Sequence, residues 1–230
     1  WGMSRISANK IAASIWKRAS GCNVASAAIS GFRQKEMKSG AEAYFNAVNK
    51  AGGVNGRKIK LVTLDDGYEP ERAAANTRAL INENKVMALF GYVGTPTSNA
   101  ALPIFTEAKV PFIGAFTGAQ SLREPFNRYI FNVRGSYFDE TEAIVGHLVQ
   151  QGIKNIAVFY QNDAYGKAGL AGVERALKKR NLQIAVTATV ERNTVDVAKA
   201  VDTLAKSKTG AVIMVSAYKS CAAFIREMKK

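Results

Sequence analysis

Short apolar runs alternate with amphipathic segments along residues 36 to 230, about every 25 residues. Continuous apolar runs are typical of strands whose two sheet faces are both covered. The segments between them carry apolar residues at helical spacing. The predicted strands are 58–64, 86–90, 110–115, 129–133, 155–160, 182–190 and 211–216. The predicted helices are 36–50, 70–84, 97–108, 138–151, 165–179, 195–206 and 218–230. This alternation predicts an α/β protein with mainly parallel sheets.

Residues 1–35 do not follow this alternation. They contain no clear strand, although a doubly wound domain is expected to begin with one. Residues 36–134 and 135–230 each carry the strand and helix scheme. We therefore expect an atypical N-terminal segment, 1–35, followed by two α/β parts.

The formal net charge of +14 does not by itself predict a nucleic-acid partner. Residues 1–35 hold six basic residues and no acidic one, and the other 195 residues hold 26 basic and 18 acidic residues. These later basic residues are mixed with acidic ones, and no RNA-binding motif or zinc-finger spacing is present. We expect a modestly basic surface and no nucleic-acid partner. The apolar run 11–15 is too short for the core of a signal peptide.

The sequence lacks the common signatures of catalysis and of cofactor binding. It has no glycine-rich dinucleotide fingerprint, no P-loop and no G-x-S-x-G nucleophile elbow. His147 is the only histidine and lies within a predicted helix. Cys22 and Cys221 are far apart in sequence, and whether they pair is left open. We expect no enzyme activity, no cofactor and no metal site.

Parallel sheets bind ligands beyond the carboxyl ends of their strands, so the loops there are the candidate sites. The first loop, 94–98, places Thr95 among several hydroxyls at the start of a helix. Such a start can hold a carboxylate or phosphate, and simple N-capping is the alternative. The second loop carries Ala115, Phe116 and Thr117, whose oxygens could accept from an ammonium group. Tyr165 and Tyr218 each lie where a loop meets a helix, and either could cover an aliphatic side chain.

Several segments, in this order, resemble one known family. They are Ala41-Glu42-Ala43-Tyr44-Phe45-Asn46, Gly52-Gly53-Val54-Asn55-Gly56-Arg57-Lys58-Ile59, Asp65-Asp66-Gly67-Tyr68-Glu69-Pro70, Phe90-Gly91, Val110-Pro111-Phe112-Ile113 and Asn162-Asp163-Ala164-Tyr165-Gly166. Together they are similar to type I periplasmic binding proteins, and more narrowly to the branched-chain amino-acid (Leu/Ile/Val) binding proteins of ABC transporters. The resemblance covers residues 36–230.

The resemblance implies two Rossmann-like lobes that close on a ligand. It implies that Thr95 and Thr117 hold the α-carboxylate of the ligand, and that the Ala115 carbonyl contacts its α-amino group. Phe116 belongs to the same loop. Tyr165 and Tyr218 would close over the ligand from the second lobe.

The resemblance also implies what this chain lacks. The family's first strand is expected before residue 36, and the family continues beyond residue 230, so both lobes are expected to be incomplete: most of the first in 36–134 and part of the second in 135–230. The function implied is an extracytoplasmic, periplasmic receptor that passes a small amino acid to a membrane permease. An amide, urea or aromatic acid is the alternative ligand, and a nucleotide-dependent enzyme is less favoured.

Overall fold

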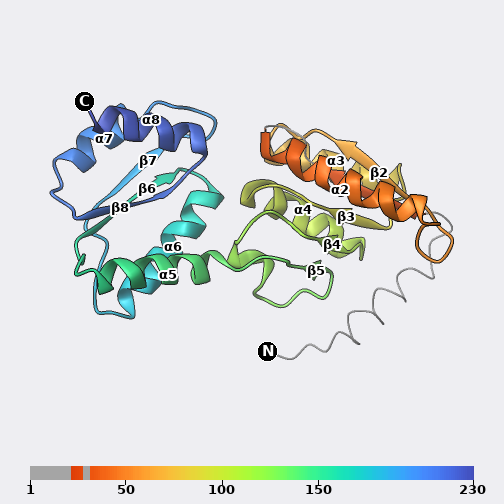
Figure 1. The fold of residues 1–230 in the computed structure, drawn as a ribbon, viewed down its shortest axis with the longest axis horizontal. Coiled ribbons are helices and arrows are strands. Elements are labelled where there is room, and N and C mark those ends of the chain that lie inside the picture. Colours follow the sequence, from red (N-terminus) through yellow and green to blue (C-terminus); the bar gives the residue numbers. More distant parts are fainter. Residues whose placement is uncertain (1–21, 28–31) are drawn as a thin grey trace. The chain divides into compact units, whose positions relative to one another are not determined.

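The computed structural model describes residues 22–27 and 32–230 (Figure 1). These residues form two compact units that interleave along the chain. Unit 1 comprises the described residues up to Val93, together with 97–116 and 127–133. Unit 2 comprises 94–96, 117–126 and 134–230. Each unit contains its own parallel sheet, which confirms the predicted α/β class.

Unit 1 is built on a five-stranded sheet in the order β2-β1-β3-β4-β5, and every neighbouring pair is parallel. Its strands are β1 (Cys22–Ala27), β2 (Ile59–Leu64), β3 (Ala88–Phe90), β4 (Phe112–Ile113) and β5 (Ile130–Phe131). Its helices are α2 (Phe32–Lys50), α3 (Pro70–Asn82) and α4 (Thr95–Glu107), of which the first two residues belong to unit 2.

The expectation that residues 1–35 contain no strand is wrong. Cys22–Ala27 form β1, which pairs with β2 on one side and with β3 on the other. The segment has small, weakly strand-forming residues, so its sequence gives little indication of a strand. Pairing with a neighbour on each side overrides such a weak local preference.

The register of β3 and β4 places the aromatic core of unit 1. Leu89 pairs with Phe112, and Phe90 with Ile113, so the members of each pair share one sheet face. Phe112 stacks on Phe105 of α4 with ring centroids 4.4 Å apart, whereas Phe90 meets Phe45 of α2 at 5.9 Å. Helices therefore cover both faces, as the apolar strands predict.

Unit 2 contains a three-stranded parallel sheet in the order β7-β6-β8. Its elements are η1 (Gln120–Leu122), α5 (Tyr137–Gln150), β6 (Ile156–Gln161), α6 (Ala164–Lys178), β7 (Thr187–Val190), α7 (Ala198–Ala205), β8 (Ala211–Val215) and α8 (Tyr218–Met228). In Figure 1, α5 and α6 lie on one side of this sheet, and α7 and α8 on the other.

Alternate side chains of β6 belong to two separate hydrophobic cores. Ile156 and Val158 pack with apolar residues of α5 and α6. Ala157 and Phe159 point to the opposite face, where Phe159 stacks on Phe224 of α8 with centroids 4.4 Å apart. Successive side chains of a strand face opposite sides, so a strand buried on both faces is continuously apolar.

The remaining differences from the predicted elements are small. The strand predicted over 182–190 is regular only over Thr187–Val190, and the helix predicted from residue 195 begins at Ala198. None of the helices in the described part of the chain has the length and apolar character needed to cross a bilayer.

Candidate functional site

Two threonines from separate loops meet in unit 2. Thr95 is the first residue of α4, and Thr117 lies in the segment after β4. Their hydroxyl oxygens are 2.7 Å apart, and both residues are buried. The sequence predicted each as a site residue, and the structure brings them together across 22 positions of chain.

The hydroxyl of Thr117 makes two further hydrogen bonds. It accepts from the backbone N–H of Ala119 at 3.2 Å and donates to the hydroxyl of Tyr137 at 3.3 Å. A hydroxyl has one hydrogen to donate. Since Thr117 gives its hydrogen to Tyr137, Thr95 must be the donor in the Thr95–Thr117 pair.

Tyr137 is a candidate site residue, because of its contact with Thr117, that the sequence does not single out. It is the first residue of α5, directly after Ser136, and Ser136 with Asp139 forms a complete capping box. The two hydrogen bonds from Ser136 hold the pKa of Asp139 below its usual range. Tyr165 and Tyr218 are predicted as site residues because each lies where a loop meets a helix, and Tyr137 occupies the same kind of position.

Gly118 lets Tyr137 approach the Thr117 loop closely. The backbone N–H of Tyr137 donates to the carbonyl of Gly118 at 2.7 Å. A Cβ on Gly118 would lie 2.6 Å from the Tyr137 ring, closer than real Cβ atoms come. The glycine therefore has a steric role beside the hydroxyls.

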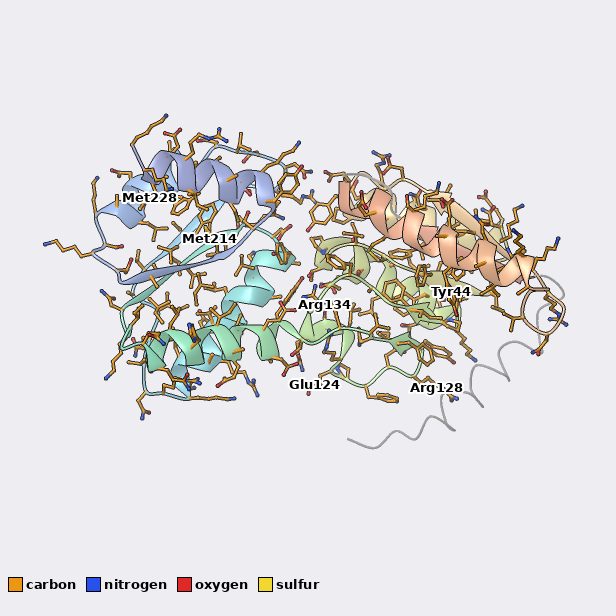
Figure 2. All side chains as sticks on the ribbon, viewed as in Figure 1. Tyr44, Glu124, Arg128, Arg134, Met214 and Met228 are labelled. Atoms are coloured by element: carbon orange, nitrogen blue, oxygen red, sulfur yellow. The ribbon has the colours of Figure 1, made fainter. Side chains whose placement is uncertain are left out.

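Arg123 forms hydrogen bonds to both chain segments of the candidate site, the one after Thr117 and the one before Tyr137. Its guanidinium donates to the carbonyls of Ala119, Arg134 and Gly135 at 2.9, 2.9 and 3.1 Å. Partial burial, together with the charge of Arg134, lowers the pKa of Arg123. Arg134, labelled in Figure 2, leads into α5, and its guanidinium carbon lies 5.5 Å from the centre of the Tyr137 ring.

Tyr165 is positioned by the turn between β6 and α6. Asp163 caps α6 by accepting from the backbone N–H groups of Tyr165 at 2.9 Å and Gly166 at 3.1 Å. The half-buried Tyr165 ring then lies 5.6 Å from the Tyr137 ring, with the ring planes 52° apart. Tyr137 thus contacts both Thr117 and Tyr165, two residues predicted from the sequence.

The remaining predicted residues are Ala115, Phe116 and Tyr218. Ala115 and Phe116 belong to unit 1, where Ala115 is buried and the N–H of Phe116 donates to the carbonyl of Tyr92 at 2.6 Å. Tyr218, the first residue of α8, is 58% exposed. Its phenol is therefore available to solvent.

Within the described ranges, no three His, Cys, Asp or Glu side chains are grouped so that they could hold a metal ion. His147 is exposed on α5. Cys221 is a free thiol whose pKa is raised by burial, and the side chain of Cys22 lies outside the described residues. The contacts described around Thr117 are hydrogen bonds between neutral hydroxyls and the contact of two aromatic rings.

Comparison with known proteins gives one family. A family model described as periplasmic binding protein matches residues 26–230. A Pseudomonas aeruginosa protein named "Amino acid binding protein" is 31% identical over 60% of this chain and 37% of its own length. A Brucella abortus protein named "Leu/Ile/Val-binding protein homolog 7" is 27% identical over 80% of this chain. The chain spans 48% of that relative, so it covers less than half of either.

A solved structure has the same fold at higher identity. A possible leucine/isoleucine/valine-binding protein from Rhodopirellula baltica is 37% identical, with a TM-score of 0.84. The match covers 90% of this chain and 59% of that structure. This similarity is consistent with the predicted fold, which is that of a two-lobed, type I periplasmic binding protein of which this chain contains a part.

Proposed function

This chain belongs to the periplasmic binding protein family, and we propose that it is the solute-binding part of an ABC transporter for a small, branched-chain amino acid.

 The ligand that we propose is an aliphatic, branched-chain amino acid, and the proposed partner is a membrane permease. The observation that carries the proposal is the buried pair of hydroxyls of Thr95 and Thr117, 2.7 Å apart at the first residue of α4. Relatives named for binding Leu, Ile and Val support this choice of ligand.

The proposed role is binding and delivery, not catalysis. The helix start at Thr95 favours an anionic group, because the first backbone N–H groups of a helix have no partner within the helix. The aromatic rings of Tyr137 and Tyr165, 5.6 Å apart, offer an apolar surface for an aliphatic side chain. The family's name supports a location outside the cytoplasmic membrane.

Isothermal titration calorimetry on the full-length gene product tests the proposal. We expect saturable heat with leucine, isoleucine or valine. Thr95→Val keeps the shape of the side chain and removes its hydroxyl, so it is expected to weaken binding. The matched control is Thr187→Val, on an exposed position of β7.

Two results would overturn the amino-acid proposal. One is the absence of heat with all three amino acids. The other is saturable binding of benzoate or of an aliphatic amide by the same gene product when it binds none of the three amino acids. That result would assign the site to the alternative ligand class.

A further inference from the structure

We infer that Tyr137 donates a hydrogen bond to the anionic group of the ligand, at the end of a chain of three hydroxyls that runs from Thr95 through Thr117 to Tyr137. The inference rests on the proposed function and deepens it, because it says how the same site recognises a carboxylate. The sequence expectation gave that task to Thr95 and Thr117. The hydrogen bonds of the two threonines are the reason to assign it to Tyr137.

The hydroxyl of Thr117 has no capacity left for a ligand. A hydroxyl offers one hydrogen and two lone pairs. Thr117 accepts from the N–H of Ala119 and from Thr95, and it donates to Tyr137. A carboxylate can only accept, so it could bind this hydroxyl only if the bond to Tyr137 were broken.

The hydroxyl of Thr95 is also a poor partner for an anion. Because Thr117 donates its one hydrogen to Tyr137, the hydrogen of Thr95 goes to Thr117, 2.7 Å away, and only the lone pairs of Thr95 are left. Two sets of lone pairs facing each other repel, so a carboxylate gains nothing there. Thr95 therefore acts through Thr117 and is a positioning residue.

Tyr137 is the member of the chain with a hydrogen to give. Its hydroxyl oxygen accepts from Thr117, and within the described part of the chain its own hydrogen goes to no partner. Hydrogen-bonded hydroxyls polarise one another, so the last donor of the chain is strengthened. The guanidinium of Arg134, 5.5 Å from the ring centre, draws electron density in the same sense.

The neighbourhood of Tyr137 suits a small carboxylate with an apolar side chain. Tyr137 itself is 9% exposed, so its donor is shielded from water. The half-buried ring of Tyr165 lies 5.6 Å from it and can contact the apolar part of such a ligand. Hydrogen bonds to charged groups gain most where water is excluded.

Calorimetry with Tyr137→Phe tests the inference. This change removes one oxygen and keeps the ring. We expect the affinity of the full-length gene product for leucine to fall about tenfold or more, the effect of losing a hydrogen bond to a charged group. The affinity for leucinol, which has an alcohol in place of the carboxylate, is expected to change less than threefold.

The matched control is Tyr160→Phe in β6. Tyr160 is also half-buried in unit 2, and within the described residues its hydroxyl makes no hydrogen bond. We expect its leucine affinity to match that of the unaltered protein. A second measurement avoids any folding defect: 3-fluorotyrosine at position 137 should give a 19F resonance that moves when leucine is added.

The outcomes separate the inference from the proposed function. If the unaltered protein binds leucine and Tyr137→Phe binds it equally well, or if the 19F resonance does not move, Tyr137 is not the donor and the proposed function stands. Equal losses for leucine and leucinol would also overturn the inference, because they would indicate a general packing role. If the unaltered protein binds no amino acid, the proposed function and the inference both fall.

Discussion

The backbone carbonyl of Gln161, the last residue of β6, occupies the space that a Cβ on Gly166 would need. Gly166 lies in the first turn of α6, one residue after Tyr165. The absence of a side chain at position 166 therefore allows α6 to start directly against the end of the strand.

Gly166→Ala is expected to destabilise unit 2. The obstacle is backbone, which cannot rotate away as a side chain can, so we expect a loss near the upper end of about 1–3 kcal/mol for overpacking. Thermal unfolding followed by circular dichroism measures it. Gly40→Ala in α2 is the control: a Cβ there meets nothing within 4 Å, and we expect a gain of about 0.5–1 kcal/mol. Equal melting temperatures for the two variants would contradict the steric argument.

Asp163→Ala is expected to cost about 2–4 kcal/mol in the free energy of unfolding. It removes the cap of α6, and it also leaves the amide of Gln161, which is 2% exposed and donates to Asp163 at 2.6 Å, without its acceptor. Asp163→Asn keeps an oxygen for the cap, and the Gln161 amide can turn to accept from the new NH₂ group. We expect that variant to lose less than about 1 kcal/mol. Urea unfolding compares the two, and equal losses would argue against the capping role.

Much of the fold could be predicted from the sequence, because apolar runs such as 155–160 report burial on both faces directly. β1 could not, since Cys22–Ala27 become a strand through pairing with β2 and β3. The strand predicted from residue 182 starts later for a related reason. Leu182 and Ile184 pack against the core formed by α5 and α6 without joining the regular ladder.

Two hydroxyls of the candidate site could be named from the sequence, but their arrangement and the role of Tyr137 could not. Thr95 and Thr117 each stood out as a hydroxyl in a loop after a strand. Nothing in their spacing indicates that the two oxygens form a hydrogen bond, or that Thr117 directs its hydrogen to Tyr137. Those relationships depend on how the loops pack, which is set by contacts such as that of Gly118 with Tyr137.

Glu142→Gln is expected to loosen the contact between α5 and the end of α6. Glu142 pairs with Lys179 at 3.1 Å and with Arg180 at 2.8 Å, and these two cations hold its pKa below the usual range. A lowered pKa stabilises the fold above the unfolded pKa, and this stability is lost as the pH falls through the folded pKa. The side chains are partly exposed, so we expect a loss of about 0.5–1 kcal/mol at pH 7.

Thermal unfolding at high salt is the control for the charge effect of Glu142. The difference between Glu142→Gln and the unaltered protein in thermal unfolding should shrink in 1 M NaCl, because exposed charges are screened there. Glu227→Gln, which breaks a more exposed pair with Lys230, should have a smaller effect. A salt-independent loss for Glu142→Gln would mean that packing and not charge holds this contact.

Asp66→Asn is expected to raise stability at neutral pH. Asp66 follows β2 and is fully buried; its Oδ1 accepts from the N–H of Tyr68 at 2.8 Å, whereas Oδ2 has no hydrogen-bond partner within the described residues. Burial, followed by the charge of Asp65, raises the pKa of Asp66 to about 6. A raised carboxyl pKa favours the folded state below the unfolded pKa, near 3.8, and this stability is lost as the pH rises to about 6. The loss in the free energy of unfolding is up to about 3 kcal/mol.

Asparagine at position 66 keeps the Oδ1 acceptor and carries no charge. The Asp66→Asn variant should therefore melt at a higher temperature than the unaltered protein at pH 8, and this difference should vanish by pH 4. Asp196→Asn, at an exposed carboxylate just before α7, is the control, and its melting temperature should match that of the unaltered protein at each pH. A constant difference between Asp66→Asn and the unaltered protein from pH 4 to pH 8 would show that Asp66 does not titrate in this range.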